Sequence, residues 1–437
     1  MRKFIEEREQ EVLLLLITML AVARWWVPSV RGFENIYPAS QWVLSYDYGL
    51  IRRGLLGTIA KMWMPIVSIK DVQHTALAAY CIFLALLLVI FYFLLKNKEK
   101  NGRLFRLILL FIAAPATLSL LARDLGRFDL FLIMIILLSL SLLSLNKHVW
   151  LIPILMITAM FIHESFLVLY TPTIIAAMIF VYAWGKRSEI DSRQKTAGMT
   201  VLRVIVVSTI SVLAAFFILY KFGYPTLGYD EFSRLVQSRA TFRVTDLSMR
   251  ECYYSLKDHT ALTSPYLHDT GSILDFFGAL LILSPVILIL LNLWTHALRN
   301  CGSHPNAGFQ RGACWLFFLA TLSGLILLPI ATDYGRWLSA ITFCNFFAIF
   351  FLVSKDIIKV ESLPEYSGGS FTLLFVLIIL TYLLFGPLHD WEPYPYQHNL
   401  IYSSLSTIAV LVFDIGFIHR WRSVNAKSRF QSSNQED

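Results

Sequence analysis

Long apolar runs separated by short polar connections occupy most of this chain. Runs of about 20 residues with few charges are typical of membrane-spanning helices. Two neighbouring runs meet at His163 and Glu164, and we interpret them as two short spans. With one long span, the Lys- and Arg-rich loops that follow would lie on the extracytoplasmic side. The predicted spans lie at 12–28, 75–95, 105–122, 128–145, 149–162, 165–184, 200–220, 274–294, 313–331, 336–354, 371–387 and 400–418. The pattern therefore predicts an all-α, polytopic membrane protein with about 12 transmembrane helices.

The composition agrees with this pattern. Of the 437 residues, 57% are hydrophobic and 15% are charged, and the mean hydropathy is +0.63. Soluble proteins carry about 25% charged residues, so the composition excludes a soluble enzyme. The first apolar run has no small-residue cleavage site, and we interpret it as a retained helix rather than a removed signal peptide. Residues 1–437 are expected to form a single integral membrane domain.

Lysine and arginine are concentrated in short connections that fall on one side of the predicted membrane. Examples are the connections at 96–106 and 186–203. Since short cytoplasmic connections are enriched in Lys and Arg, both termini are predicted to be cytoplasmic. This topology also accounts for the net charge of +8, so we expect no nucleic-acid partner. The opposite, extracytoplasmic face collects three longer polar regions, at 29–74, 221–273 and 386–399.

Three short stretches share an Asp-x-Gly pattern that is closely followed by arginine. They are Asp47-Tyr48-Gly49 with Arg52 and Arg53, Asp124-Leu125-Gly126 with Arg127, and Asp333-Tyr334-Gly335 with Arg336. Each lies at or near the end of an apolar run, and the predicted topology places all three on the extracytoplasmic face. Helix capping in a tight turn explains one such stretch. Three on one face, together with His163 and Glu164, favour a functional site, because charges in a bilayer are costly.

The segment 50–69 carries two of these arginines. Its apolar residues recur in a way that predicts an interfacial amphipathic helix rather than a span. Arg52 and Arg53 fall in its first turns, beside Asp47. The carboxylate can pair with the two guanidiniums, or the arginines can bind a phosphate group in bidentate fashion. A local ion pair on a snorkelling helix is the simpler alternative.

Two further groups of residues are candidates for chemistry. Glu164 lies in an apolar stretch, so it is either half of a structural pair with an arginine or a proton acceptor whose pKa that arginine sets. In the region 221–273, Arg239 and Arg243 would share one helix face. With the tyrosines and mixed charges around them, they suit carbohydrate or an anionic lipid head group, although any solvated loop has a similar composition.

Several chemistries lose support. The five cysteines are scattered, without CxxC spacing or an adjacent histidine cluster, so neither a metal site nor a disulfide framework is expected. The chain has no P-loop, no GxGxxG after a strand, no HExxH and no GxSxG. We expect no cofactor. Charges near the middle of the spans are almost absent, which disfavours an ion-coupled transporter.

The layout resembles the polytopic glycosyltransferases of the GT-C class, which use polyprenyl-phosphate-linked sugars. In that class an acidic residue of the first extracytoplasmic loop serves as the base or orients the acceptor, and Asp47 occupies that place. Here it is followed by Tyr48, whereas many members carry an Asp-Glu pair. The resemblance implies a catalytic role for Asp47 and donor phosphate binding by Arg52 and Arg53. From their positions on the same face we further expect catalytic roles for His163 and Glu164, donor phosphate binding by Arg127 and Arg336, support from Asp124 and Asp333, and an acceptor loop with Arg239 and Arg243.

Within the class, the size and the basic balance are similar to those of serotype-converting O-antigen glucosyltransferases. That resemblance implies a bacterial inner-membrane protein whose partners are a polyprenyl-phosphate-linked sugar, a lipid-linked polysaccharide acceptor and the bilayer. O-antigen polymerases, which join lipid-linked repeat units, resemble the chain in length and span count. A flippase or transporter for a lipid-linked sugar is a third, non-enzymatic alternative.

Overall fold

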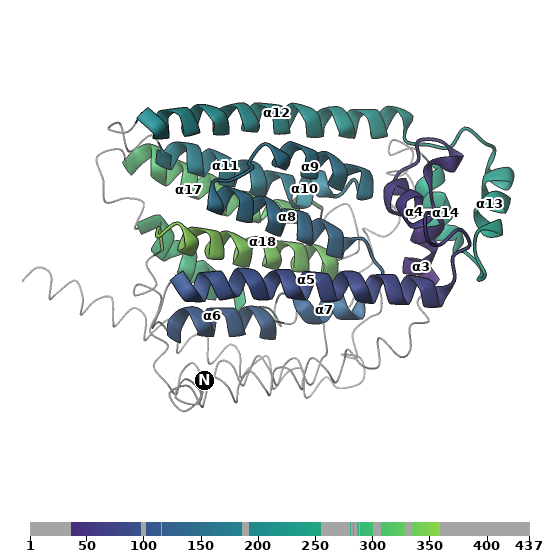
Figure 1. The fold of residues 1–437 in the computed structure, drawn as a ribbon, viewed down its shortest axis with the longest axis horizontal. Coiled ribbons are helices and arrows are strands. Elements are labelled where there is room, and N and C mark those ends of the chain that lie inside the picture. Colours follow the sequence, from purple (N-terminus) through teal and green to yellow (C-terminus); the bar gives the residue numbers. More distant parts are fainter. Residues whose placement is uncertain are drawn as a thin grey trace, which may run out of the picture.

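The computed structural model describes residues 36–97, 102–114, 116–185, 192–254, parts of 280–299, 307–327 and 334–358. In these residues long helices lie side by side in a bundle, with short helices gathered at one end (Figure 1). The only β-pairing among them is an isolated bridge between Val67 and Ala240. The predicted all-α architecture is confirmed for this part of the chain.

Five helical segments of the described residues are long and apolar enough to cross a membrane. They are Ile69–Lys96, Gly102–Ala122, Phe166–Trp184, Val201–Phe222 and Gly335–Ser354, and shorter apolar helices occupy Asp129–Leu145 and Leu151–Ile162. These are the lengths and compositions of a helical membrane protein. The predicted spans at 12–28, 371–387 and 400–418, and the loop at 386–399, lie outside the described residues, and 274–294 is described only in part.

The helices of the bundle follow the apolar runs closely. They are α5 (Ile69–Asn97), α6 (Gly102–Ala113), α7 (Leu118–Arg123), α8 (Asp129–Leu145), α9 (Leu151–Ile162), α10 (Phe166–Leu169), α11 (Thr171–Gly185), α12 (Ser192–Phe222), α17 (Ala307–Thr321), the 3₁₀ turn η3 (Ser323–Leu327) and α18 (Tyr334–Ser354). The predicted break at His163 and Glu164 is confirmed, because α9 ends at Ile162 and α10 begins at Phe166.

Burial separates the helices into inner and outer ones. Most of α18 is buried, while α5 and α12 leave most of their apolar surface uncovered on opposite sides of the bundle (Figure 1). Phe111 of α6 packs edge-on against Phe91 of α5 and Phe350 of α18. Uncovered apolar helix faces are suited to contact with lipid, since backbone polar groups within a helix are already paired.

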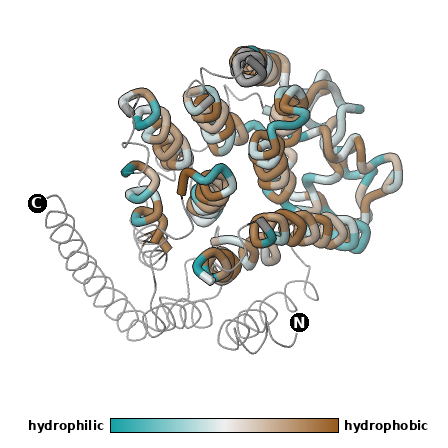
Figure 2. The backbone as a smooth tube through the Cα atoms, turned by 60° about the vertical axis from the view of Figure 1, so that its left-hand side comes forward, coloured by the Kyte–Doolittle hydropathy of each residue, from teal (hydrophilic) through white to brown (hydrophobic). Residues whose placement is uncertain are grey.

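Short helices form a cap at one end of the bundle, on the right in Figure 1. The cap comprises α3 (Ile36–Val43), the 3₁₀ turn η1 (Tyr46–Tyr48), α4 (Gly54–Ala60), α13 (Tyr229–Ser238) and α14 (Asp246–Tyr253). Hydrophilic residues are frequent in its loops, whereas the long helices are mostly hydrophobic (Figure 2). Trp42 of α3 donates a hydrogen bond from Nε1 to the Gly126 carbonyl at 2.7 Å, which ties the cap to the start of α8.

Helix α4 lies against the end of α3 with almost no space between them. A Cβ atom at Gly57 would fall inside the contact distance of the Leu44 carbonyl group and 2.9 Å from the Trp42 carbonyl oxygen. Only glycine allows two backbones to approach so closely. This contact fixes the position of the residues that precede α4, Arg52 and Arg53.

The interfacial helix predicted at 50–69 is wrong in its extent. Only Gly54–Ala60 is helical, and the chain then turns before α5 begins at Ile69. Pro65 explains the interruption, because it has no backbone N–H and disfavours helical geometry at the residue before it. In the turn, Met62 is 85% exposed, and Trp63 and Ile66 are also exposed.

Candidate functional site

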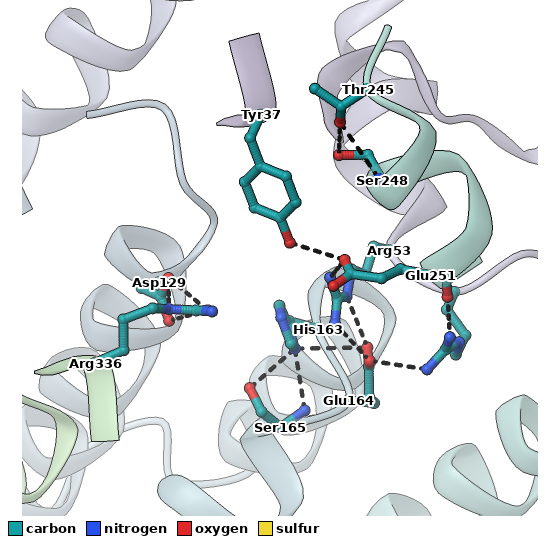
Figure 3. A network of polar contacts seen from close by, with 11 residues as sticks. Tyr37, Arg53, Asp129, His163, Glu164, Ser165, Thr245, Ser248, Glu251 and Arg336 are labelled. Atoms are coloured by element: carbon teal, nitrogen blue, oxygen red, sulfur yellow. Dashed lines mark hydrogen bonds and ion pairs between the residues drawn. The ribbon is translucent and has the colours of Figure 1, made fainter. Parts of the chain in front are cut away.

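A cluster of buried charged side chains lies where the cap meets the bundle (Figure 3). Glu164, from the break between α9 and α10, faces both Arg52 and Arg53. Arg53 donates from Nη2 to Glu164 Oε1 at 2.9 Å and from Nε to Oε2 at 3.3 Å, and Arg52 Nη1 lies 3.3 Å from Oε1. Both arginines are buried. One carboxylate therefore binds two guanidiniums away from water.

The backbone before α4 explains how neighbouring arginines reach the same carboxylate. Gly49 has a φ of 110° and Arg53 a φ of 59°, so the chain is left-handed at both positions. Successive side chains normally diverge along a helix or a strand, and the left-handed turn at Arg53 removes this divergence. For a residue other than glycine this conformation costs about 1–2 kcal/mol. The contacts of the guanidinium with acidic groups offset that cost.

Glu251 of α14 completes the cluster from the cap side. Its Oε2 accepts from Arg53 Nη1 at 2.6 Å and from the Tyr37 hydroxyl at 2.8 Å. Arg52 Nη2 also donates to the Glu251 backbone carbonyl. Sequence reasoning missed Glu251 and Tyr37, because no local pattern distinguishes this glutamate from the other acidic residues of the same polar region. The contacts tie α14 and α3 to the buried arginines.

His163 lies between this cluster and a second ion pair (Figure 3). Its Nδ1 accepts the backbone N–H of Ser165 at 3.1 Å, so the proton of the neutral ring is on Nε2. Burial, with a contribution from Arg53, lowers the pKa of His163 from 6.5 to about 3. Burial alone would raise the pKa of Glu164, but Arg53, His163 and Arg52 lower it well below 4.5. At neutral pH His163 is therefore uncharged and Glu164 ionised, and both are weak proton acceptors.

The second ion pair joins two helices far apart in the sequence. Asp129, the first residue of α8, accepts from Arg336 of α18 in bidentate fashion, at 3.1 Å from Nε to Oδ2 and 2.9 Å from Nη2 to Oδ1. The Arg336 guanidinium also lies over the Trp337 ring, 5.2 Å from its centroid. Arg336 therefore pairs with Asp129, which sequence reasoning did not single out. Asp333 lies outside the described residues.

A small cavity lies beside this pair. Its volume is about 20 Å³, large enough for a single water molecule. Asp124 and Arg127 line it together with Asp129, Arg336 and Tyr170. Arg127 also lies over the Tyr37 ring, 5.4 Å from its centroid. The structure thus brings Arg127 and Asp124 to the same end of the bundle as the buried cluster.

Arg336→Lys is expected to lower stability, because an ammonium cannot reproduce the planar two-bond contact with Asp129. Losing a charge-assisted hydrogen bond in a buried setting costs about 1.5–3 kcal/mol. The measurement is the thermal midpoint of the purified protein in detergent. Arg250→Lys is the matched control, since Arg250 makes an exposed pair with Asp246, and such pairs contribute little. Equal midpoints for the parent and Arg336→Lys would contradict the prediction.

Asp47 contacts Lys61 and Ser45, so of the two alternatives the structure does not form the pairing of Asp47 with Arg52 and Arg53. Its Oδ2 accepts from Lys61 Nζ at 2.7 Å and from Ser45 Oγ at 3.0 Å. The left-handed turn that directs both arginines to Glu164 leaves Asp47 beside Lys61. The hydrogen bond from Lys61 lowers the pKa of the Asp47 carboxyl group. Asp47 is 41% exposed and is therefore accessible from solvent.

Arg239 and Arg243 do not share a helix face, and that prediction is wrong. Helix α13 ends at Ser238, and the Gln237 side chain holds the following turn by donating to the Phe242 carbonyl at 2.7 Å and accepting from the Val244 N–H at 3.0 Å. Arg239 instead donates from Nη1 to the Val43 carbonyl at 2.8 Å. Each arginine therefore faces a different part of the cap.

An open groove of about 870 Å³ lies on the cap and includes Arg243. Its other lining residues are Ile36, Asp230, Ser233, Arg234, Gln237, Val244, Thr245, Asp246 and Met249. The polar members are mostly side chains that donate or accept several hydrogen bonds. A ligand rich in hydroxyl groups matches such a surface.

Among the described residues, no group of three His, Cys, Asp or Glu side chains is placed to hold a metal ion. The arrangement can instead orient hydroxyl groups and hold acidic side chains ionised. The chain was also compared with models of known protein families, with curated proteins and with solved structures. None of the three comparisons finds a match. A function for this chain is therefore inferred from the residues of the site.

Proposed function

We propose that this chain is a membrane glycosyltransferase. It transfers a sugar, which we propose to be glucose, from a polyprenyl-phosphate donor to O-antigen or another surface polysaccharide. The observation that carries the proposal is the position of the site. Arginines and carboxylates meet at the end of apolar helices, directly beneath a polar cap with an open groove. A lipid-linked donor arrives through the bilayer and a saccharide acceptor arrives through water, so an enzyme that joins them needs both surfaces.

The membrane arrangement follows the charge distribution. About 12 spans, with both termini in the cytoplasm of a bacterium, place the cap on the extracytoplasmic side of the inner membrane. Regions 29–74 and 221–273 both contribute to the cap, and the described part of each contacts the other through Tyr37 and Glu251. The proposed acceptor therefore meets the enzyme outside the cytoplasm.

Asp47 is proposed to act on the acceptor. It orients an acceptor hydroxyl group and takes its proton as the hydroxyl oxygen forms a bond to the anomeric carbon of the donor sugar. The bond from that carbon to the phosphate oxygen breaks, and polyprenyl phosphate leaves with the electron pair. Cationic side chains beside the leaving phosphate stabilise its charge. Glu164 and Glu251 hold Arg52 and Arg53, and through them the segment that carries Asp47.

Asp47→Asn is expected to lower transfer about 10²–10⁴-fold, the usual contribution of a general base. Asp47 is half exposed and its ion pair with Lys61 lies at the surface, so the variant should reach the membrane at the parent level. The measurement is sugar transfer from a polyprenyl-phosphate donor in membranes with matched protein content. Asp71→Asn, at an exposed acid that hydrogen-bonds to Ser68, is the control. Full activity of Asp47→Asn would exclude Asp47 from the reaction.

A gel of lipopolysaccharide from a deletion strain separates the proposal from its alternatives. Loss of a transferase that decorates the polysaccharide leaves chain length intact and removes one sugar. Loss of a polymerase leaves single-repeat lipopolysaccharide. A flippase would instead move a labelled polyprenyl-phosphate sugar across liposomes without transferring it. Either of the last two results would replace the proposed reaction.

A further inference from the structure

The charges of the buried cluster restrict where a donor phosphate can bind. Arg52 and Arg53 face the carboxylates of Glu164 and Glu251, so these four side chains are neutral as a set. Arg336 and Asp129 likewise form a neutral pair. A phosphate bound to either group would add an uncompensated negative charge in a buried place, which is costly. A phosphate is better accommodated where cations outnumber acids.

One edge of the Arg239 guanidinium has hydrogen-bond donors without an acceptor. Its Nε and Nη2 atoms are shielded from solvent and make no hydrogen bond of standard geometry within the described part of the chain, although the guanidinium lies near the Tyr48 hydroxyl. These two atoms form one side of the guanidinium, the same side by which Arg336 meets Asp129. That side matches two oxygens of a phosphate or a carboxylate. A shielded donor without a partner indicates a missing ligand, ion or water.

The backbone places Arg239 beside Asp47 and Lys61. The Arg239 carbonyl accepts from the Val67 N–H at 2.7 Å, and its Nη1 donates to the Val43 carbonyl at 2.8 Å. Asp47 follows Val43 by four residues and pairs with Lys61 at 2.7 Å. Arg239 is also close enough to help lower the pKa of Asp47 after the larger effect of Lys61. Lys61 pairs with Asp47 and Arg239 lies near the same acid, so these three side chains carry one positive charge in excess.

Exposed apolar residues lie next to these cations. Met62 and Trp63 follow Lys61 directly, and Ile66 lies between them and the span at Ile69–Lys96. Tryptophan is enriched at membrane interfaces, and lysine beside it carries its charge at the level of the lipid head groups. The turn that bears these residues is joined to Arg239 through Val67. The excess charge therefore lies where lipid phosphates are found.

We propose that Arg239 and Lys61 bind the phosphate of a membrane lipid, which in the proposed reaction is the polyprenyl-phosphate donor. Arg239 is partly exposed, and rotation of its side chain opens the Nε and Nη2 edge to the phosphate. Lys61 turns from Asp47 to the same phosphate, and Asp47 becomes available to the acceptor hydroxyl. Only the choice of this lipid rests on the proposed function. The site itself rests on the unused guanidinium edge, the excess charge and the exposed tryptophan.

Binding of undecaprenyl phosphate to the purified full chain in nanodiscs tests the proposal. Arg239→Lys keeps the charge and removes the two-bond edge, and Lys61→Gln removes a surface cation without touching the fold. Each is expected to weaken binding at least tenfold. Lys70→Gln, at an exposed lysine that is the second residue of α5, is expected to bind as the parent does, and undecaprenol without phosphate is expected to bind all four proteins equally. Unchanged binding of the phosphate lipid by both Arg239→Lys and Lys61→Gln would overturn the proposal.

Competition distinguishes a lipid phosphate from a free one. Inorganic phosphate at millimolar concentration is expected to leave the lipid bound, and displacement by it at that concentration would assign the site to a soluble anion instead. No acceptor is present in this assay, so its result is independent of transfer. A chain that binds the lipid through Arg239 but transfers no sugar keeps this inference and overturns the proposed function. A chain that transfers sugar while all variants bind the lipid equally keeps the proposed function and overturns this inference.

Discussion

Gly57→Ala is expected to abolish folded protein or to lower its stability more than any other single methyl group added to the described helices. The new Cβ would meet the backbone of Leu44 and Trp42, and a backbone segment cannot move aside as a flexible side chain can. Overpacking of this kind costs about 3 kcal/mol or more. The measurement is the amount of monodisperse protein after detergent extraction, together with its thermal midpoint.

Gly312→Ala is the matched control for this substitution. Gly312 lies within α17, and a Cβ there would meet nothing within 4 Å. Alanine favours a helix over glycine by about 0.5–1 kcal/mol, so this variant should be as stable as the parent or more so. If Gly57→Ala behaved like Gly312→Ala, the close approach of α4 to the end of α3 would be wrong.

Glu164→Gln is expected to be the most destabilising change among the charged residues. Two buried guanidiniums would lose their shared carboxylate. Breaking a buried pair by removing one partner costs about 3–5 kcal/mol, because a charge remains without compensation. The thermal midpoint in detergent should fall clearly. Asp246→Asn, which breaks the exposed pair with Arg250, should change it little. Similar midpoints for the two variants would show that the cluster is not a buried one.

The same cluster gives stability a defined dependence on pH. Glu164 has its pKa lowered well below 4.5, chiefly by Arg53 acting against burial, so its contribution is present above about pH 4.5 and is lost as the pH falls further. Burial lowers the pKa of His163 from 6.5 to about 3. As the pH falls from 6.5 towards 3, His163 takes up a proton in the unfolded chain and not in the folded protein, so the folded protein loses stability. The thermal midpoint of Glu164→Gln should therefore fall less than that of the parent when the pH is lowered below 4.5.

Much of the fold could be predicted from the sequence because membrane helices are encoded locally. A long apolar run is sufficient to predict α5, α12 or α18, and a His-Glu pair within such a run indicated the break before α10. Where Pro65 interrupts the pattern, the prediction of a helix over 50–69 extended too far. At the end of α13 a side chain, Gln237, closes a turn that no periodicity reveals.

The sequence predicted that several of these charged residues gather at one end of the bundle, and it did not predict how they pair. The Asp-x-Gly-Arg stretches drew attention to one end of the bundle, but the partners of their arginines come from elsewhere. Arg53 pairs with Glu164 and Glu251, and Arg336 pairs with Asp129, 207 positions away. Such pairs depend on which helices pack together. A single sequence contains local spacing and composition, and neither specifies contacts between distant segments.

The left-handed residues Gly49 and Arg53 also limit how the chain can change in length. Both lie between η1 and α4, just before the close contact at Gly57. Inserting or removing one residue there would rotate α4 by about 100° about its axis. Gly57 would then no longer face the end of α3, and a residue with a side chain would take its place there. Some positions between residues 49 and 57 can therefore accept substitutions, whereas insertions and deletions in this segment are not tolerated.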